Sequence, residues 1–156
     1  MSTPASEAEQ KVQEDLYRLD TYRSQLNTLL QQHQLLTASR GDHLRARESL
    51  EGLDRTEPGT EILVPLGADT FLRGSALPGA KVLIGVGSRV VVEMERPKVS
   101  ELLAQRLERL DKAASDLEGQ IRTLDERVQA VSQRLDSLAQ SAQDSERRGP
   151  GNVGGN

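Results

Sequence analysis

An uninterrupted apolar repeat in the C-terminal part of the chain constrains the fold most. Its members are Leu103, Leu107, Leu110, Ala114, Leu117, Ile121, Leu124, Val128, Val131, Leu135, Leu138 and Ala142. Because the intervals alternate between four and three residues, these side chains form one narrow stripe along a helix. A stripe of this width packs against a single partner helix, whereas a helix in a globular core needs a broader apolar face. The pattern therefore predicts a coiled-coil helix over residues 97–145, which begins near Pro97.

The partner helix is predicted over residues 7–54, where the spacing is the same but polar residues take several of the positions. The predicted stripe runs through Leu19, Tyr22, Leu26, Leu29, His33, Leu36, Arg40, His43, Arg47 and Leu50, and Leu16, Leu30, Leu44 and Leu53 widen it on one side. Two helices of nearly equal length around a short insert can pack antiparallel. With Asp54 opposite Lys98, Leu16 comes close to Asp136, and both chain ends meet at one tip.

A different pattern occupies residues 57–95, between the two helices. Pro58 and Gly59 stop the first helix, because proline disfavours helical backbone before it and glycine tolerates positive φ. Four short β-type runs follow, at 62–64, 70–72, 82–84 and 90–92, with turn residues between them. This spacing predicts two successive β-hairpins.

Short strands of this kind leave unpaired edges, which native proteins avoid. The hairpins are therefore predicted to pair with strands of other chains. The residues expected at this oligomerisation surface are Val64, Leu66, Phe71, Leu72, Val82, Ile84, Val86, Val90 and Val92.

These parts define the predicted fold class, a mainly α protein with a small β part. It is a long antiparallel coiled-coil hairpin whose helices are joined by two β-hairpins. Composition agrees, because apolar residues make up 35% of the chain, against roughly 45–50% in an average globular domain. We expect residues 1–156 to form a single domain, with the glycine-rich residues 147–156 as a disordered tail.

Charge and residue content exclude several classes of function. The formal net charge of -4 disfavours binding to a nucleic-acid backbone. The chain has no Cys, which removes disulfides and thiolate chemistry. No apolar run approaches the roughly 18 residues of a membrane span, and the start lacks the apolar stretch of a signal peptide. We therefore expect a cytoplasmic protein that binds neither nucleic acid nor membrane.

Catalytic and metal-binding chemistry has few candidates. His33 and His43 are the two histidines of the chain, and they lie ten residues apart without a carboxylate cluster of metal-ligand spacing. They are interpreted as partly buried seam residues or interhelical hydrogen-bond donors. Gly85-Val86-Gly87 lies between two predicted strands with no following helix to bind phosphate, so it is interpreted as a turn. We expect no enzyme activity, no cofactor and no metal site.

The hairpin region also contains distinctive motifs. They are Val64-Pro65-Leu66-Gly67, Phe71, Gly74, the run Lys81-Val82-Leu83-Ile84-Gly85-Val86-Gly87, and Val92-Glu93. Together with the order helix, two hairpins, helix, these motifs resemble archaeal prefoldin alpha subunits, over about residues 8–145. The chain departs from that family at Arg89 and Val90, where the family commonly has a glycine followed by an aromatic residue.

The resemblance implies a hexamer of two alpha and four beta prefoldin subunits, whose hairpins close into two stacked eight-stranded barrels. Closed barrels have no open strand edges, in agreement with the argument from the hairpins. The resemblance further implies an ATP-independent molecular chaperone. Such a chaperone captures unfolded client proteins at the coiled-coil tips and delivers them to a group II chaperonin.

The tip is the candidate client-binding site, because the apolar stripe thins to alanine near the free ends of the helices. One interpretation is that the terminal stripe residues only zip the helices together. The other is that the last turns separate and expose them to apolar segments of clients, and the two interpretations are compatible. The residues expected to contact clients are Leu16, Leu19, Val131, Leu135 and Leu138.

Two other functions agree with the same residues. A structural coiled-coil scaffold would bind one defined folded partner, using a charge-patterned strip along its helices. A homo-oligomeric prefoldin-like chaperone would assemble without a beta subunit. Competition between unrelated unfolded proteins separates a chaperone from a scaffold.

Overall fold

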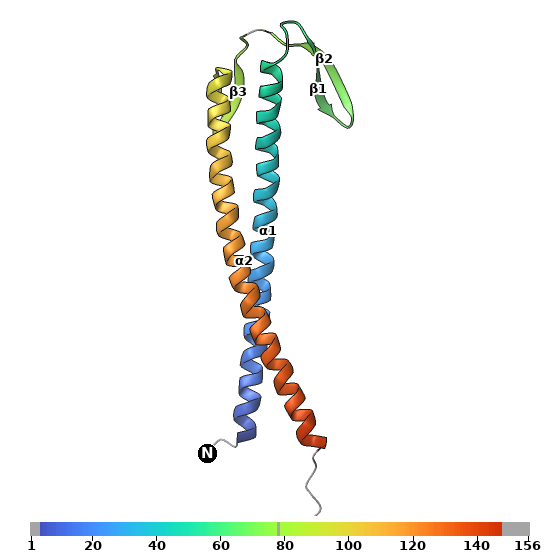
Figure 1. The fold of residues 1–156 in the computed structure, drawn as a ribbon, viewed down its shortest axis with the longest axis vertical. Helices are drawn as coiled ribbons and strands as arrows, with labels where there is room; N and C mark the ends of the chain where they lie inside the picture. Colours follow the sequence, from blue (N-terminus) through green and yellow to red (C-terminus); the bar gives the residue numbers. More distant parts are fainter. Residues whose placement is uncertain (1–3, 78, 148–156) are drawn as a thin grey trace, which may run out of the picture. The chain divides into compact units, whose positions relative to one another are not determined.

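The computed structural model describes residues 4–77 and 79–147 of the chain. Its elements, in order, are α1 (Pro4–Asp54), β1 (Glu61–Gly67), β2 (Thr70–Ser75), β3 (Val82–Gly87), β4 (Val90–Met94) and α2 (Arg96–Arg147) (Figure 1). Two long helices joined by two antiparallel hairpins confirm the predicted fold class. The chain divides into two compact units. Unit 1 combines the residues up to Gln34 with those from Ser115 onward, and unit 2 is Leu35–Ala114.

Both helices are longer than the sequence pattern indicated. α1 begins at Pro4 rather than at residue 7, and proline is accepted in the first turn of a helix because that turn's N–H groups have no intrahelical partner. α2 begins at Arg96, with Pro97 in its first turn. It extends to Arg147, so the first residue of the expected disordered tail 147–156 is helical. The rest of that tail lies outside the described residues.

The predicted stripe of α2 is confirmed as a packing seam in each unit. Leu103 is buried in unit 2, and Leu124 and Val131 are buried in unit 1. The seam thins toward the end of the helix, where Leu138 is 36% exposed and Ala142 is exposed as well. The 4-3 spacing therefore located the buried face of α2 and also the place where burial ends.

The stripe of α1 differs from the predicted one at its charged positions. Arg40 and Arg47 are exposed, and Ser39 is partly buried instead. Burying a guanidinium group without a full set of partners is costly, so these arginines lie beside the seam. Arg40 pairs with Asp111 on α2, while Arg47 pairs with Glu51 one turn further along its own helix at 3.0 Å.

Polar contacts between the helices mark the antiparallel register within each unit. In unit 2, a guanidinium nitrogen of Arg96 lies 3.2 Å from a carboxylate oxygen of Asp54. In unit 1, Nε2 of His33 lies 3.1 Å from Oε1 of Glu118. The expected pairing of Asp54 with Lys98 is therefore off by two residues, because apolar spacing alone does not show which turns of the two helices meet.

Each hairpin is antiparallel and has an irregular register next to its turn. The register of β1 with β2 shifts between Pro65 and Gly67, and that of β3 with β4 shifts between Gly85 and Gly87. Such bulges increase the local twist of the strands. Proline is tolerated in β1 because this strand belongs to a two-stranded sheet and has one unpaired edge.

The hairpin turns are formed by residues with positive φ. The first turn has Ala68 at +47° and Asp69 at +56°, and the second has Ser88 at +49° and Arg89 at +62°. Two successive left-handed residues match the right-handed twist of the strands, which is why such turns favour Asn-Gly and similar pairs. Arg89 therefore occupies a backbone position that suits glycine, the residue common there in the family that the sequence resembles.

The second hairpin packs on the helices of unit 2. Leu50 of α1, Ile84 of β3, and Val99 and Leu103 of α2 form one buried apolar cluster, against which Val82, Val92, Met94 and Leu102 pack. Val99 is the most deeply buried of these side chains, at 2% exposure. Arg106 of α2 adds a hydrogen bond from its guanidinium group to the carbonyl oxygen of Gly85 at 2.6 Å. One face of this hairpin is thus part of the core of the unit.

Arg96 joins the segments that connect the hairpins to the helices. Its side chain is 16% exposed and pairs with Asp54 at the end of α1. It also donates hydrogen bonds to the carbonyl oxygens of Leu77 at 3.1 Å and Ala80 at 3.2 Å. One guanidinium group therefore connects the end of α1, the linker between the hairpins and the start of α2.

Gly119 in α2 offers a test of helix stability with a matched control. A methyl group added at Gly119 meets no atom within 4 Å, and the same holds for Gly59, whose φ is +83°. We expect Gly119→Ala to raise the free energy of unfolding by about 1 kcal/mol, because alanine is the better helix former. Gly59→Ala is expected to lower it by about 1 kcal/mol, because alanine is strained at positive φ. Urea unfolding monitored by circular dichroism measures both free-energy changes. Changes of the same sign would contradict the helical backbone at Gly119 or the positive φ at Gly59.

Arg89 offers a test of the second turn. We expect Arg89→Gly to raise the free energy of unfolding by about 0.5–1 kcal/mol, since glycine adopts left-handed backbone without the steric cost of a Cβ atom. Arg73→Gly is the control, because Arg73 lies in the extended strand β2 with a 78% exposed side chain. This control is expected to be destabilising. A destabilising effect of Arg89→Gly in thermal unfolding would show that the turn does not require positive φ there.

Candidate functional site

The open end of unit 1, where α1 begins and α2 ends, contains a groove. Figure 1 shows the two helix ends of this unit diverging from each other. The groove has a volume of about 520 Å³, and we call it the tip groove. Its lining residues are Ala8, Glu9, Val12, Gln13, Leu138, Ser141 and Ala142. Four of these seven are apolar, but two of the four are alanines and Leu138 is 36% exposed, so few large seam side chains join the helices where they diverge.

The predicted client-contact residues fall into three environments. Leu138 is 36% exposed and lines the tip groove. Leu19 at 8% and Val131 at 7% exposure are buried in the seam, and Leu135 is partly buried. Leu16 is 51% exposed and is not a seam residue. Their contact with clients stays a prediction, and it concerns side chains that differ widely in accessibility.

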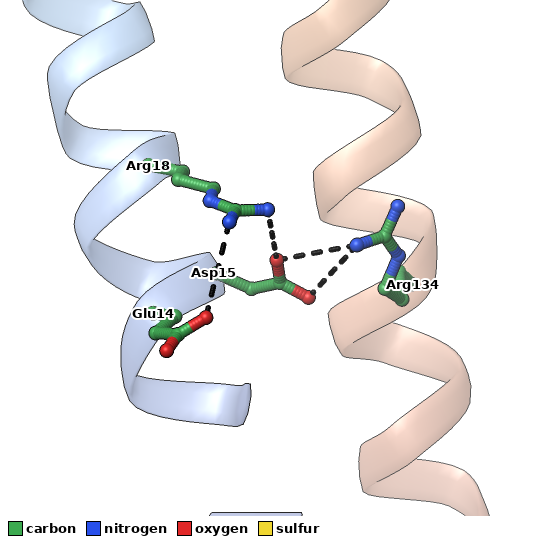
Figure 2. Close-up of polar contacts among 4 residues, drawn as sticks. All are labelled: Glu14, Asp15, Arg18 and Arg134. Atoms are coloured by element: carbon green, nitrogen blue, oxygen red, sulfur yellow. Dashed lines mark hydrogen bonds and ion pairs between the residues drawn. The ribbon is translucent and has the colours of Figure 1, made fainter. Parts of the chain in front are cut away.

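Asp15, not Leu16, occupies the seam position next to Leu19. Only 4% of Asp15 is exposed, and its carboxylate accepts hydrogen bonds from Arg134 of α2 at 3.3 and 3.4 Å (Figure 2). This contact between the helices lies one residue before the expected Leu16 on α1 and two residues before the expected Asp136 on α2. The predicted stripe began at Leu19 with Leu16 at its side, although a step of four back from Leu19 selects Asp15 and a further step of three selects Val12. Spacing by itself could have identified it.

The residues expected at the oligomerisation surface divide between the two hairpins. Val64, Leu66, Phe71 and Leu72 of the first hairpin are all at least 40% exposed. In the second hairpin, Val86 and Val90 are exposed. The remaining three, which are Val82, Ile84 and Val92, contact the helical core of their own chain. Their side chains therefore serve packing within unit 2, and only their backbone edge is left for pairing between chains.

The first hairpin shows how much apolar surface the chain presents. The side chains of Val64 and Leu72 share one face of this hairpin, and Phe71 lies on the other with Pro65 as its partner. All four are exposed. A two-stranded sheet with apolar side chains exposed on both faces is at most marginally stable alone, so this surface favours a partner.

The two histidines make ordinary structural contacts. Nε2 of His33 lies beside Glu118 of α2, which is one of the two roles expected for it, and Nδ1 of His43 lies 2.7 Å from the carbonyl oxygen of Ser39 on its own helix. Within residues 4–77 and 79–147, no group of three or more metal-ligating side chains comes together. In the same residues, neither helix has a stretch long and apolar enough to cross a membrane.

Comparison with known proteins identifies the family. The family model for prefoldin subunits matches residues 22–141. The chain belongs to the prefoldin family. Prefoldin subunit alpha of Pyrococcus horikoshii is 30% identical over 125 residues, which cover 80% of this chain and 84% of that one. Prefoldin subunit alpha 1 of Thermococcus kodakarensis is 32% identical over 102 residues, 65% of this chain and 70% of that one.

Solved prefoldin structures share the fold. The cryo-electron microscopy structure of filamentous prefoldin from Methanocaldococcus jannaschii matches with a TM-score of 0.63 and 20% identity, covering 74% of this chain and 95% of that one. The crystal structure of the prefoldin beta subunit from Thermococcus strain KS-1 matches with a TM-score of 0.55 and 19% identity, covering 81% and 90%.

Family membership confirms several predictions from the sequence. The chain is a prefoldin chaperone subunit of the alpha type, and prefoldin subunits are not enzymes. Subunits of this family assemble into prefoldin oligomers. Which residues of this chain form the oligomer contacts stays a prediction, with which the exposed apolar side chains of the first hairpin agree.

Proposed function

We propose that this chain is the alpha subunit of a hexameric, ATP-independent chaperone with two alpha and four beta subunits. In this proposal the hexamer captures unfolded proteins at the tip groove of each alpha chain and at the corresponding ends of the beta chains. It then delivers them to a group II chaperonin in the cytoplasm. Transfer to a chaperonin is expected because a chaperone that only holds unfolded proteins needs a second chaperone to fold them.

Assembly through the hairpins rests on their exposed apolar surface and open edges. Leu66 is 64% exposed and Phe71 is 55% exposed, and both belong to a two-stranded sheet with unpaired edges. Pairing with strands of other subunits satisfies those edges and buries these side chains. Each apolar side chain of this size contributes about 1.5–3 kcal/mol on full burial. Several such contacts per hairpin favour association, together with the backbone hydrogen bonds that paired strands form.

Capture of clients rests on the tip groove, which is the observation that supports the proposal best. The groove is apolar at Val12, Leu138, Ala8 and Ala142, and it opens where the helices of unit 1 diverge. One groove of this kind offers few large side chains, so a single contact with a client is weak and has little sequence preference. Simultaneous contacts at several tips of one oligomer raise the overall affinity by increasing the effective concentration of the remaining sites.

The first test concerns assembly. We expect the combined substitution Leu66→Ser and Phe71→Ser to abolish association with beta subunits while the chain stays folded, because both side chains are exposed within the chain. Leu35→Ser is the matched control, since Leu35 is 72% exposed on α1, outside the hairpins. Native mass spectrometry of the tagged chain purified from its own cells measures the outcome.

The wild-type chain and the Leu35→Ser control are expected in complexes of two copies with four of a smaller subunit. A complex that contains only this chain would contradict the stoichiometry and favour a homo-oligomeric chaperone. One folded protein bound to a single copy of the chain would favour a scaffold.

The second test concerns clients. We expect Leu138→Ser to weaken the suppression of aggregation of unfolded proteins several-fold while the oligomer stays intact, because it removes the largest exposed apolar side chain of the tip groove. Leu35→Ser is expected to leave suppression unchanged. The assay follows light scattering of two unrelated unfolded proteins at several ratios of oligomer to client. Equal suppression by Leu138→Ser and the wild type would show that the tip groove does not bind clients. When both unfolded proteins are present together, they are expected to compete for the oligomer, and a lack of competition would favour a scaffold.

A further inference from the structure

Asp15 stands out in the apolar seam of unit 1. Among the residues that the structure describes, it is the only polar or charged residue that is buried. Its neighbours along the seam of α1 are Val12 on one side and Leu19 on the other. A leucine at this position would extend the coiled coil by one more apolar layer toward the end of the helices. At this position of the seam, a charged carboxylate therefore takes the place of an apolar side chain that would pack against α2.

The contacts of Asp15 come from both helices (Figure 2). Arg134 of α2 reaches across and donates to both carboxylate oxygens, at 3.3 and 3.4 Å. Arg18 approaches from the same helix as Asp15, at 3.9 Å, and also pairs with Glu14 at 3.8 Å. Only the contact with Arg134 holds the two helices together, because the other one stays within α1.

This contact between the helices is a loose one. Hydrogen bonds between an arginine and a carboxylate are usually about 2.7–2.9 Å long, whereas both bonds here are longer. The Arg134 side chain is 57% exposed, while that of Asp15 is 6% exposed. Water can therefore solvate the exposed guanidinium group as soon as the pair separates, so the pair favours the closed tip only modestly and a client can displace it.

The pair lies at the boundary between the closed and the open part of the seam. On one side, Leu19 and Val131 are buried. On the other side, Leu138 lines both the tip groove and a second hollow that reaches Asp15 and Arg134. Separation of the pair would thus extend the tip groove toward side chains that the closed seam covers.

We propose that the Asp15–Arg134 pair is a latch that keeps the tip closed without a client and lets it open when a client enters. This inference rests on the proposed function, because it concerns the same groove and the same clients. Because a buried carboxylate takes the place of a leucine, the closed tip is only weakly stabilised. The pairing with Arg134 fixes which turns of α1 and α2 meet when the tip is closed. The latch then sets how many of the seam side chains a client can reach, among them Leu19 and Val131.

Two substitutions in the assembled oligomer test the latch in opposite directions. We expect Asp15→Leu to close the seam, which slows amide hydrogen exchange in residues 8–19 and 131–142 several-fold and weakens suppression of aggregation several-fold. We expect Arg134→Gln to free the helix ends. Exchange in the same residues then accelerates several-fold, with suppression at least as strong as in the wild type. Hydrogen exchange is followed by mass spectrometry, and suppression by light scattering.

Arg18→Gln is the matched control, because it removes a contact of Asp15 that does not cross between the helices. It is expected to leave both exchange and suppression near the wild-type values. The latch is wrong if Asp15→Leu exchanges as fast as the wild type, if it slows exchange but captures clients equally well, or if Arg18→Gln acts like Arg134→Gln. A wild-type oligomer that suppresses no aggregation contradicts the proposed function, whereas hydrogen exchange still decides whether the pair closes the tip.

Discussion

The apolar seam between α1 and α2 is the interaction on which the rest of this structure depends. Long isolated helices with mostly exposed surfaces gain little stability from propensity alone, so packing of one apolar stripe against the other holds them. In unit 2, β3 and β4 also pack against seam residues of the helices, namely Leu50, Val99 and Leu103. In unit 1 it weakens toward the helix ends, where Asp15 replaces an apolar side chain and the groove begins.

The two hairpins have the same construction but different environments. Both have a bulge next to a turn of two left-handed residues. The second hairpin uses one face for the core of its own chain, since Ile84 is buried there. The first exposes apolar side chains such as Phe71 and Leu72. An exposed apolar sheet with open edges explains in physical terms why a chain of this family is suited to an oligomer.

The predictions from the sequence agreed best with the structure where apolar residues occupy every position of a regular spacing. The seam of α2 and the two hairpins were predicted in that way, and the helix ends differ by a few residues. Arg40 and Arg47 fall on the predicted stripe of α1 but are exposed and ion-paired, because burying a guanidinium group is costly. Asp15 was missed because the predicted stripe of α1 stopped at the last large apolar residue, Leu19, although the same spacing continues to Asp15.

By itself, the sequence determined the order of elements, the seam of α2 and the two hairpins, because each depends on local spacing and on turn residues close together in the chain. The resemblance to prefoldin alpha subunits was carried by motifs of the same local kind. Only the tertiary structure decided which hairpin face is buried, which turns of α1 and α2 meet, and that Asp15 pairs with Arg134. These features depend on contacts between residues far apart in the chain, and apolar periodicity is unchanged when one helix shifts along the other by a few residues.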